Sequence, residues 1–121
     1  MSPPESRRVF KVTTRTAWEG ALKRGALALS SDDARDGFTH LSAKHQLAET
    51  LAKHFNAQPD LLLIELDAAV LGAALRWERS RGGDFFPHLY TPLPASAARA
   101  VHALQLDGNG THILPEIIRQ C

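Results

Sequence analysis

Two histidines in short extended segments are the residues of this sequence best suited to chemistry. His40 stands in the stretch GFTHLS and His88 in the stretch FFPHLY. Side chains alternate between the two faces of a strand, so Ser42 shares a face with His40, and Tyr90 shares one with His88. An imidazole beside a hydroxyl can hold a ribose or phosphate oxygen, or transfer a proton as a general acid or base. His40 and His88 are therefore candidate catalytic residues, and Ser42 and Tyr90 are candidate ligand-binding residues.

The same side chains also fit structural roles. His40 could be a buried histidine bonded to the backbone, and Ser42 could be the N-cap of the helix that follows it. His88 and Tyr90 could pack as an aromatic plug against Trp77. The sequence leaves these alternatives open.

Lys11 and Thr13 share one face of an expected strand, residues 9–13, and are further candidates for ligand binding. An unpaired ammonium group is costly to bury. Lys11 therefore either lines a hydrated cleft or forms an ion pair with Glu65 or Glu78.

Three arginines precede a glycine pair, and together they could hold a phosphate group. Arg76 is the candidate ligand-binding residue of this set, which also includes Arg79 and Arg81 before Gly82-Gly83. A charged edge strand followed by an ordinary loop explains the pattern as well.

No metal site is expected, because the histidines lack the spacing of a ligand set. His45 and His54 lie nine residues apart on an expected helix, and no His-Glu-x-x-His pattern occurs. Cys121 is the sole cysteine, so neither an intrachain disulfide nor a cysteine-based zinc site can form.

Alternating or continuous apolar runs predict strands that would position these residues. The most apolar run, residues 61–67, is hydrophobic on both faces and predicts a central strand. The other strands are expected at residues 9–13, 38–42, 75–79 and 100–106. Prolines between residues 87 and 94 predict a rigid irregular segment, because proline interrupts a central ladder.

Two main helices are predicted. The first follows a capping box, Thr16 to Glu19, and ends at Gly25. The second carries Leu47, Leu51 and Phe55 on one face, and these side chains are expected to be core, like Trp18. Residues 30–37 are expected to form a polar loop and residues 95–98 one helical turn.

These elements predict one α+β domain over residues 1–121. Residues 1–7 are expected to be a disordered lead-in. Residues 111–121 are expected to form a short helical tail, docked through Ile113, Ile117 and Ile118.

The composition excludes several classes of protein. The chain has 121 residues, of which 44% are hydrophobic, and a formal net charge of +1 from 14 basic and 13 acidic residues. A dedicated duplex-DNA-binding protein would be strongly basic. No apolar run reaches the roughly 20 residues of a membrane span, and no secretory signal is visible. The expected location is the cytoplasm.

The order of motifs is identified as that of the bacterial domain-of-unknown-function 952 family. The segments that carry this resemblance are VFKVTTRTAWEGALKRGAL, DGFTHLSAKHQLAETLAKHF, DLLLIELDAAVLG, LRWERS and FFPHLYTPLPASA. They span about residues 9–98, which is most of the chain.

The same order is more distantly similar to RNA 2′-phosphotransferases and ADP-ribosyltransferases. Lys11 stands where those enzymes carry a first-strand histidine, and Thr13 matches their threonine. GFTHLS resembles their HVHLS block, which matches His40 and Ser42, and PHLYTPLP resembles a third block. The segment from Phe85 to Tyr90 lacks the acidic residue that many ADP-ribosyltransferases carry, and Glu78 does not match that position.

This resemblance implies a fold of two small, mostly antiparallel sheets that form a cleft, with two main helices. It implies a nucleotide-like ligand, with nicotinamide dinucleotide (NAD) as ligand or substrate, and transfer of ADP-ribose through an oxocarbenium-like state. His40 would hold a ribose hydroxyl and Lys11 would neutralise phosphate. Two alternatives remain: a non-catalytic nucleotide or small-ligand binding protein, and a protein-interaction module with FFPHLY as an aromatic patch.

Overall fold

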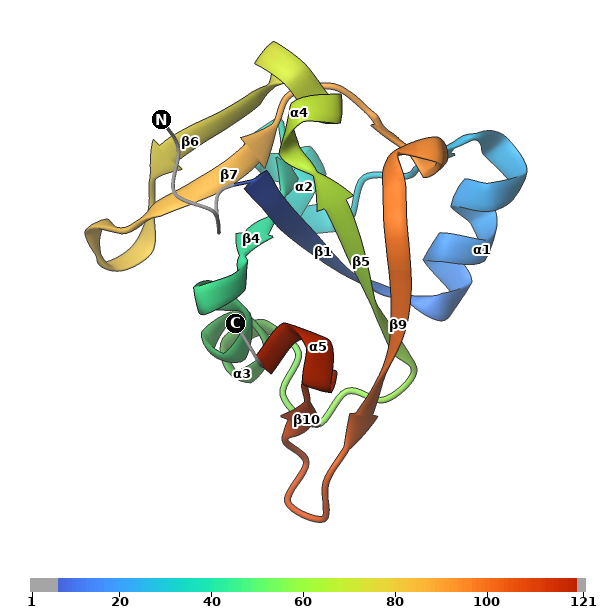
Figure 1. Cartoon of the computed structure of the whole chain (residues 1–121), viewed down its shortest axis with the longest axis vertical. Helices are drawn as coiled ribbons and strands as arrows, with labels where there is room; N and C mark the ends of the chain where they lie inside the picture. The colour runs from blue at the N-terminus through green and yellow to red at the C-terminus, as the bar shows by residue number, and fades with distance from the viewer. Residues whose placement is uncertain (1–6, 120–121) are drawn as a thin grey trace.

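The computed structural model describes residues 7–119 and has a mixed α+β architecture of curled antiparallel sheets with a few helices (Figure 1). The largest sheet has five strands, in the order β10 (His112–Ile113), β9 (Ala98–Leu106), β5 (Leu61–Asp67), β1 (Arg8–Thr14) and β4 (Ser42–Ala43). Its strand pairs are antiparallel. The first six residues, part of the predicted lead-in, and Cys121 lie outside the described residues.

β5 lies at the centre of this sheet, as its continuous apolar sequence predicts. Leu62, Ile64 and Leu66 join one hydrophobic cluster, which also contains Trp18. The alternate residues, Leu61 and Leu63, join a second cluster on the other face. Each face of the strand therefore contributes to a separate part of the core.

A second sheet has three strands, in the order β3 (Thr39–His40), β7 (Phe85–Leu89) and β6 (Leu75–Arg79). The prediction that the proline-rich segment stays out of a central ladder is wrong, because Pro87 lies in the middle strand. The neighbouring strand β3 ends at His40, and the Pro87 carbonyl accepts a hydrogen bond from the Leu41 amide just beyond it. The missing N–H of Pro87 thus falls where the ladder already ends.

Residues 39–43 connect the two sheets. β3 pairs with β7, whereas β4 pairs with β1, and the buried Leu41 lies between them. The single strand predicted at residues 38–42 is therefore two short strands in different sheets. A third sheet joins β2 (Ala26–Leu27) to β8 (Leu93–Pro94), so the structure has one sheet more than the predicted two.

Helix α1 (Arg15–Arg24) begins two residues earlier than the predicted capping box requires. Its N-cap is Thr14, whose hydroxyl accepts a hydrogen bond from the amide of Ala17. The predicted cap at Thr16 is wrong. The predicted end is confirmed, since Gly25 has a φ of 92° and its amide bonds the carbonyl of Ala21.

Helix α2 (Ser31–Asp36) occupies the segment that was predicted to be a polar loop. Ser30 and Asp33 form a capping box, because each side chain accepts a hydrogen bond from the backbone amide of the other residue. Gly37, with a φ of 85°, ends the helix. The helix positions Asp33 and Asp36 next to His40.

Helix α3 (Leu47–His54) follows a single 3₁₀ turn, Lys44–Gln46. Leu47 and Leu51 are buried, and Phe55 packs against the same cluster, as predicted. Ser42 lies in β4 and makes no N-cap; its hydroxyl bonds that of Thr50 instead. The predicted capping role of Ser42 is therefore wrong.

The remaining helices are short: α4 (Ala68–Leu71) and α5 (Glu116–Arg119). A 3₁₀ turn, Ala95–Ala97, confirms the predicted helical turn. In the tail, Ile118 is buried, but Ile113 is 44% exposed and does not dock as predicted. The side chain of Ile117 lies outside the described residues. None of the helices described in residues 7–119 is long and apolar enough to cross a membrane.

Candidate functional site

The two candidate histidines lie opposite each other in the three-stranded sheet. His40 on β3 pairs with His88 on β7, and their ring centroids are 5.8 Å apart. Arg76 on β6 pairs with His88 from the other side. The register of this sheet therefore brings together residues from three separate segments of the chain.

Two carboxylates of α2 hold the ring of His40. Its Nδ1 lies 2.7 Å from Asp33 Oδ1, and its Nε2 lies 2.9 Å from Asp36 Oδ2. An ionised carboxylate only accepts hydrogen bonds, so both contacts are hydrogen bonds when the ring carries both protons. The ring of His40 thus lies between two carboxylates, one at each nitrogen.

Lys11 contacts both Asp33 and the backbone of His40. Its Nζ lies 3.1 Å from Asp33 Oδ2 and donates to the carbonyl oxygen of His40, also at 3.1 Å. Lys11 is 8% exposed, and neither Lys11 nor Thr13 is among the residues that line the cavity described below. The partner of this buried lysine is Asp33 rather than Glu65 or Glu78.

The contacts of Asp33 determine its ionisation. Burial alone would raise its pKa, but hydrogen bonds from His40 and the charge of Lys11 lower the pKa far below its ordinary value. Asp33 therefore stays ionised and is able to fix His40 and Lys11 in place. The pKa of Asp36 is also lowered, first by a hydrogen bond from Arg35 and also by His40.

His88 is oriented by a different carboxylate. Its Nδ1 lies 2.8 Å from Glu78 Oε1, which also accepts a 2.7 Å hydrogen bond from the hydroxyl of Tyr90. Because Glu78 accepts at Nδ1, neutral His88 carries its proton there and has an acceptor at Nε2. Phe38 stacks on the His88 ring with a centroid distance of 3.9 Å and also contacts Tyr90.

These contacts shift the pKa values of both partners of His88. Hydrogen bonds from Tyr90 and His88 lower the pKa of Glu78, and the carboxylate in turn raises the pKa of Tyr90. The guanidinium of Arg76 lies over the Tyr90 ring, 4.9 Å from its centroid. The ring that packs against His88 and Tyr90 is Phe38, not Trp77, which pairs with Pro87.

A cavity of about 300 Å³ opens beside the two histidines. Its wall includes Ser42, which places this hydroxyl and both imidazoles around one space. The other lining residues come from β1, α2, α3 and β7 and their connections; they are Phe10, Val12, Ser30, Asp32, Asp33, Arg35, Asp36, Leu41, Thr50, His54, Phe55, Ser80 and Phe86. Tyr90 and Arg76 are not among the residues that line this cavity.

His88 is the buried member of the pair. It is 5% exposed, and it lines the cavity, whereas Glu78, which holds its Nδ1, does not. Within residues 7–119, nothing forms a hydrogen bond with Nε2. Nε2 is therefore the ring nitrogen that is left for a molecule in the cavity.

Sequence reasoning missed the carboxylates Asp33, Asp36 and Glu78 and the ring of Phe38. The Ser30–Asp33 spacing is a helix-start signal that could have placed Asp33 and Asp36 on a helix next to GFTHLS. Glu78 alternates with Arg76 on β6, so it shares the face that meets His88. Only the pairing of β6 with β7 makes that contact visible.

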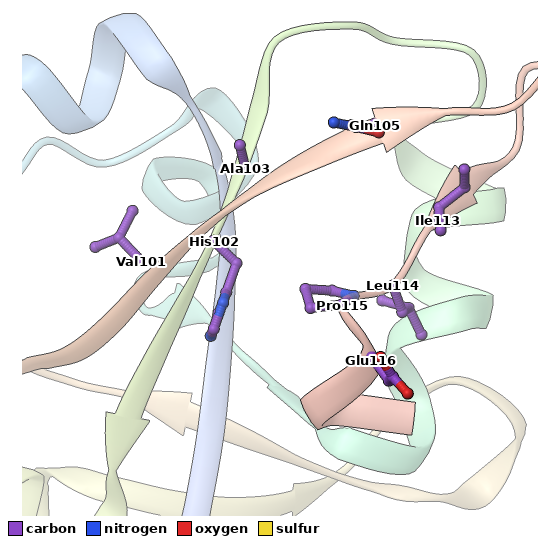
Figure 2. Close-up of a pocket in the computed structure, with 8 residues that line it drawn as sticks. All are labelled: Val101, His102, Ala103, Gln105, Ile113, Leu114, Pro115 and Glu116. Atoms are coloured by element: carbon purple, nitrogen blue, oxygen red, sulfur yellow. The ribbon is translucent and has the colours of Figure 1, made fainter. Parts of the chain in front are cut away.

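A larger hollow of about 460 Å³ lies elsewhere, between β9 and the segment that leads into α5. Figure 2 shows its side chains, among them His102 from β9 and Leu114, Pro115 and Glu116 from the tail. Nε2 of His102 is buried without a hydrogen bond, 3.5 Å from Glu65 Oε1. None of the residues predicted for the site lies there.

No metal centre is formed by the described part of the chain: residues 7–119 contain no group of three or more His, Cys, Asp or Glu side chains placed to hold an ion. The side chain of Arg81, one of the predicted arginines, lies outside the described residues. Arg79 lies over the ring of Phe85.

The chain is similar to protein CC0527 from Caulobacter crescentus, a structural-genomics target. Its crystal structure is 41% identical in sequence, with a TM-score of 0.88 over 93% of this chain and 98% of that chain. Its solution NMR structure gives a TM-score of 0.80 at 40% identity, over 95% of this chain and 97% of that chain. Comparison with curated proteins gives no match. A family model described as "Protein of unknown function (DUF952)" matches residues 12–101, and the chain belongs to that family.

Proposed function

We propose that the cavity beside His40 and His88 binds the nucleoside part of a nucleotide such as NAD, on a fold related to that of the ADP-ribosyltransferases. The observation that carries the proposal is the buried His88, oriented by Glu78 and offering Nε2 to the cavity. A hydroxyl group of a ribose can donate to this nitrogen. A volume of about 300 Å³ suits one nucleoside, because known ligand pockets span about 300–1,000 Å³.

The phosphates of such a ligand would lie outside the cavity. Lys11, expected to neutralise phosphate, is engaged by Asp33. Arg76 is a better candidate, because it is exposed, lies over the Tyr90 ring and pairs with His88 in the sheet. Lys11 then acts through Asp33, which holds His40, and Thr13 has no direct contact with the ligand.

If the bound nucleotide is also cleaved, the carboxylates near the cavity have a clear role. Breaking a glycosidic bond develops positive charge on the ribose, and Asp33, Asp36 and Glu78 are ionised groups that can stabilise it. His88, held by Glu78, is the candidate general base for the attacking hydroxyl. In this interpretation the protein is a transferase that moves the ribose part of the nucleotide to a hydroxyl group.

Binding without turnover is the second candidate. Each of the three carboxylates Asp33, Asp36 and Glu78 already accepts hydrogen bonds from neighbouring side chains, an arrangement that also suits a ligand sensor. Release of nicotinamide from NAD distinguishes the two readings. A role as an interaction module has less support, because Phe86, Pro87 and Leu89 of the proposed aromatic patch are buried.

Thermal unfolding with NAD, ADP-ribose and 2′-phosphorylated nucleotides tests the proposal. A ligand at a hundred times its dissociation constant stabilises the folded state by about 2.7 kcal/mol. We expect this shift in the unmodified protein and its loss in His88→Ala. His112→Ala is the matched control, because His112 is also buried and bonds the carbonyl of Gln58, and neither residue lines the cavity.

Both variants are expected to unfold at a lower temperature than the unmodified protein. A ligand shift retained in His112→Ala and lost in His88→Ala supports the site. The absence of a shift with every nucleotide, or a shift that His88→Ala leaves intact, contradicts it.

A further inference from the structure

We infer that the protein forms a homodimer in which the outer edge of β9 pairs antiparallel with the same edge of a second copy. The inference goes beyond the proposed nucleotide site, whose lining residues are different ones. It rests on an unprotected strand edge, on the hollow beside that edge and on the symmetry of the free stretch of β9.

One edge of β9 is open along most of its length. On one side β5 pairs with residues 98–104, whereas on the other side β10 pairs only with residues 105–106. Continued in the same register, the ladder of β10 would place Pro115 opposite Ala103, and proline has no N–H to donate. Within residues 7–119, no strand therefore pairs with the outer edge of residues 98–104.

The backbone groups on this edge alternate along the strand. The Asp107 amide donates to the Thr111 carbonyl at 2.9 Å, across the hairpin that joins β9 to β10. In an antiparallel strand, every second residue directs its N–H and C=O groups to the same side. Val101 and Ala103 therefore direct their backbone groups to the open edge, where another strand can bind them.

The open edge of β9 lacks the protection that another edge strand of the molecule has. β6, at the edge of the three-stranded sheet, carries Arg76, Glu78 and Arg79 among its five residues. Charged side chains of this kind discourage pairing with another chain. Residues 98–104 contain no proline and no lysine, aspartate or glutamate, and Val101 is 46% exposed. Such an apolar edge favours the addition of a strand.

The hollow of about 460 Å³ lies along this open edge. Figure 2 shows that three consecutive residues of β9, Val101, His102 and Ala103, line it. Neighbouring residues of a strand point to opposite faces, so a space that contacts all three lies beside the strand rather than over one face. An added strand would lie there, about 4.8 Å from β9.

A second copy of the chain is the occupant that fits this edge. Val101 is the midpoint of residues 98–104, so a two-fold axis at Val101 pairs the whole stretch with itself. The two valines then form an apolar β-branched pair and exchange both backbone hydrogen bonds. Arg99 faces Ala103 of the second copy, at the hollow that Glu116 of that copy also lines. Opposite charges therefore meet at both ends, and no like charges face each other.

A neighbouring register pairs fewer residues. A two-fold axis at His102 would place Arg99 opposite Gln105, where β10 already occupies the edge. Only residues 100–104 would then pair, and the two imidazoles would face each other. The axis at Val101 is therefore the register that we assign to the dimer.

Opposite charges introduced at Val101 test both the dimer and its register. Sedimentation velocity should show a dimer for the unmodified protein. Val101→Lys and Val101→Glu each place two like charges at the axis and should raise the dissociation constant of the dimer at least about tenfold. An equimolar mixture of the two variants should form dimers again, because lysine then faces glutamate.

Val70→Lys is the matched control. Val70 is 67% exposed on α4 and does not line the hollow, so the new charge should leave the dimer intact. Circular dichroism of all the variants shows whether they are folded, and recovery of the dimer in the mixture gives the same information for the two variants at Val101.

Hydrogen exchange measured by NMR gives a readout that needs no substitution. The amides of Val101 and Ala103 should exchange slowly in the dimer and at least about tenfold faster when the protein is diluted to the monomer. The amide of Leu63, in the central strand β5, should stay protected at both concentrations.

A protein that stays monomeric at millimolar concentration overturns the inference. So does a dimer that Val101→Lys leaves intact, a mixture of the lysine and glutamate variants that stays monomeric, or unchanged exchange of the two edge amides on dilution. None of these outcomes bears on nucleotide binding beside His88, which the thermal unfolding experiment tests separately.

Discussion

A single buried carboxylate, Asp33, binds Lys11 and His40 and also takes part in the capping box of α2. It accepts hydrogen bonds from Lys11, from the backbone amide of His40 and from the His40 ring, and its side chain also belongs to the capping box of α2. Burying one carboxylate and one ammonium is tolerated because they pair and because hydrogen bonds satisfy their remaining oxygens and protons.

Replacing Asp33 should therefore destabilise the protein strongly. Asp33→Asn leaves the buried ammonium of Lys11 without a counter-charge, and we expect a loss of about 3–5 kcal/mol in the free energy of unfolding at pH 7. Asp32→Asn, on the exposed side of the same helix, should cost less than about 0.5 kcal/mol. Lys11→Met added to Asp33→Asn should recover part of the loss. Chemical denaturation measures all three effects, and equal costs for the two asparagine variants would contradict this role.

The same carboxylate predicts a pH dependence. The pKa of Asp33 is lowered in the folded state, so the unfolded chain binds its proton first as the pH falls. The stabilisation is complete above the ordinary value of 3.8 and is lost as the pH falls below it. The difference in stability between the unmodified protein and Asp33→Asn should be constant from pH 7 to about pH 5 and should shrink below about pH 4.

At the scale of secondary structure, helix α2 supplies the two carboxylates that hold the ring of His40. It is only six residues long, so its capping box and its glycine stop contribute a large part of its stability. Asp33 and Asp36 lie one turn apart on it, which places them at the two nitrogens of His40.

Removing the N-cap of α2 should therefore affect both stability and binding. Ser30→Ala should cost about 1 kcal/mol, the usual cost of losing an N-cap. Thr14→Ala removes the N-cap of α1 at similar cost and is the matched control. Nucleotide affinity measured by calorimetry should fall in Ser30→Ala and not in Thr14→Ala. An unchanged affinity in both variants would show that α2 does not position the site.

The extent to which the sequence predicts these elements follows from their composition. β5 and β6 were predicted at their observed bounds, because β5 is a continuous apolar run, β6 alternates apolar and charged residues, and turn signals bound both. α2 was missed because serine and aspartate are typical of loops as well as of helix starts. Pro87 misled the prediction of β7, since whether a proline is tolerated depends on where the neighbouring strand ends.

The site was predictable only in part for a related reason. His40 and His88 stood out because imidazoles interrupt otherwise apolar strands, and the structure brings them within 5.8 Å of each other. Their partners Asp33 and Glu78 are ordinary charged residues in the sequence. They become part of the site through the contact of α2 with β3 and through the pairing of β6 with β7, which residue type alone does not reveal.

At the scale of the whole molecule, the cavity lies where the chain passes from the three-stranded sheet to the five-stranded sheet. Residues 39–43 leave the three-stranded sheet after His40 and join the five-stranded sheet at Ser42, so these two side chains reach the same cavity from different sheets. In Figure 1, β6 and β7 lie on one side of the β1–β5–β9 strands and α1 lies on the other. Both core clusters reach this junction, because Leu41 belongs to one of them and Phe10, the partner of Ser42, belongs to the other.

A crystal structure of the protein with a bound nucleoside is the decisive experiment for the proposed site. We expect the ligand to lie between His88 and Asp36, with a sugar hydroxyl within hydrogen-bond distance of His88 Nε2 and the base against the wall that includes Phe86. A ligand found in the hollow beside α5, or one that leaves His88 Nε2 without a contact, would contradict it.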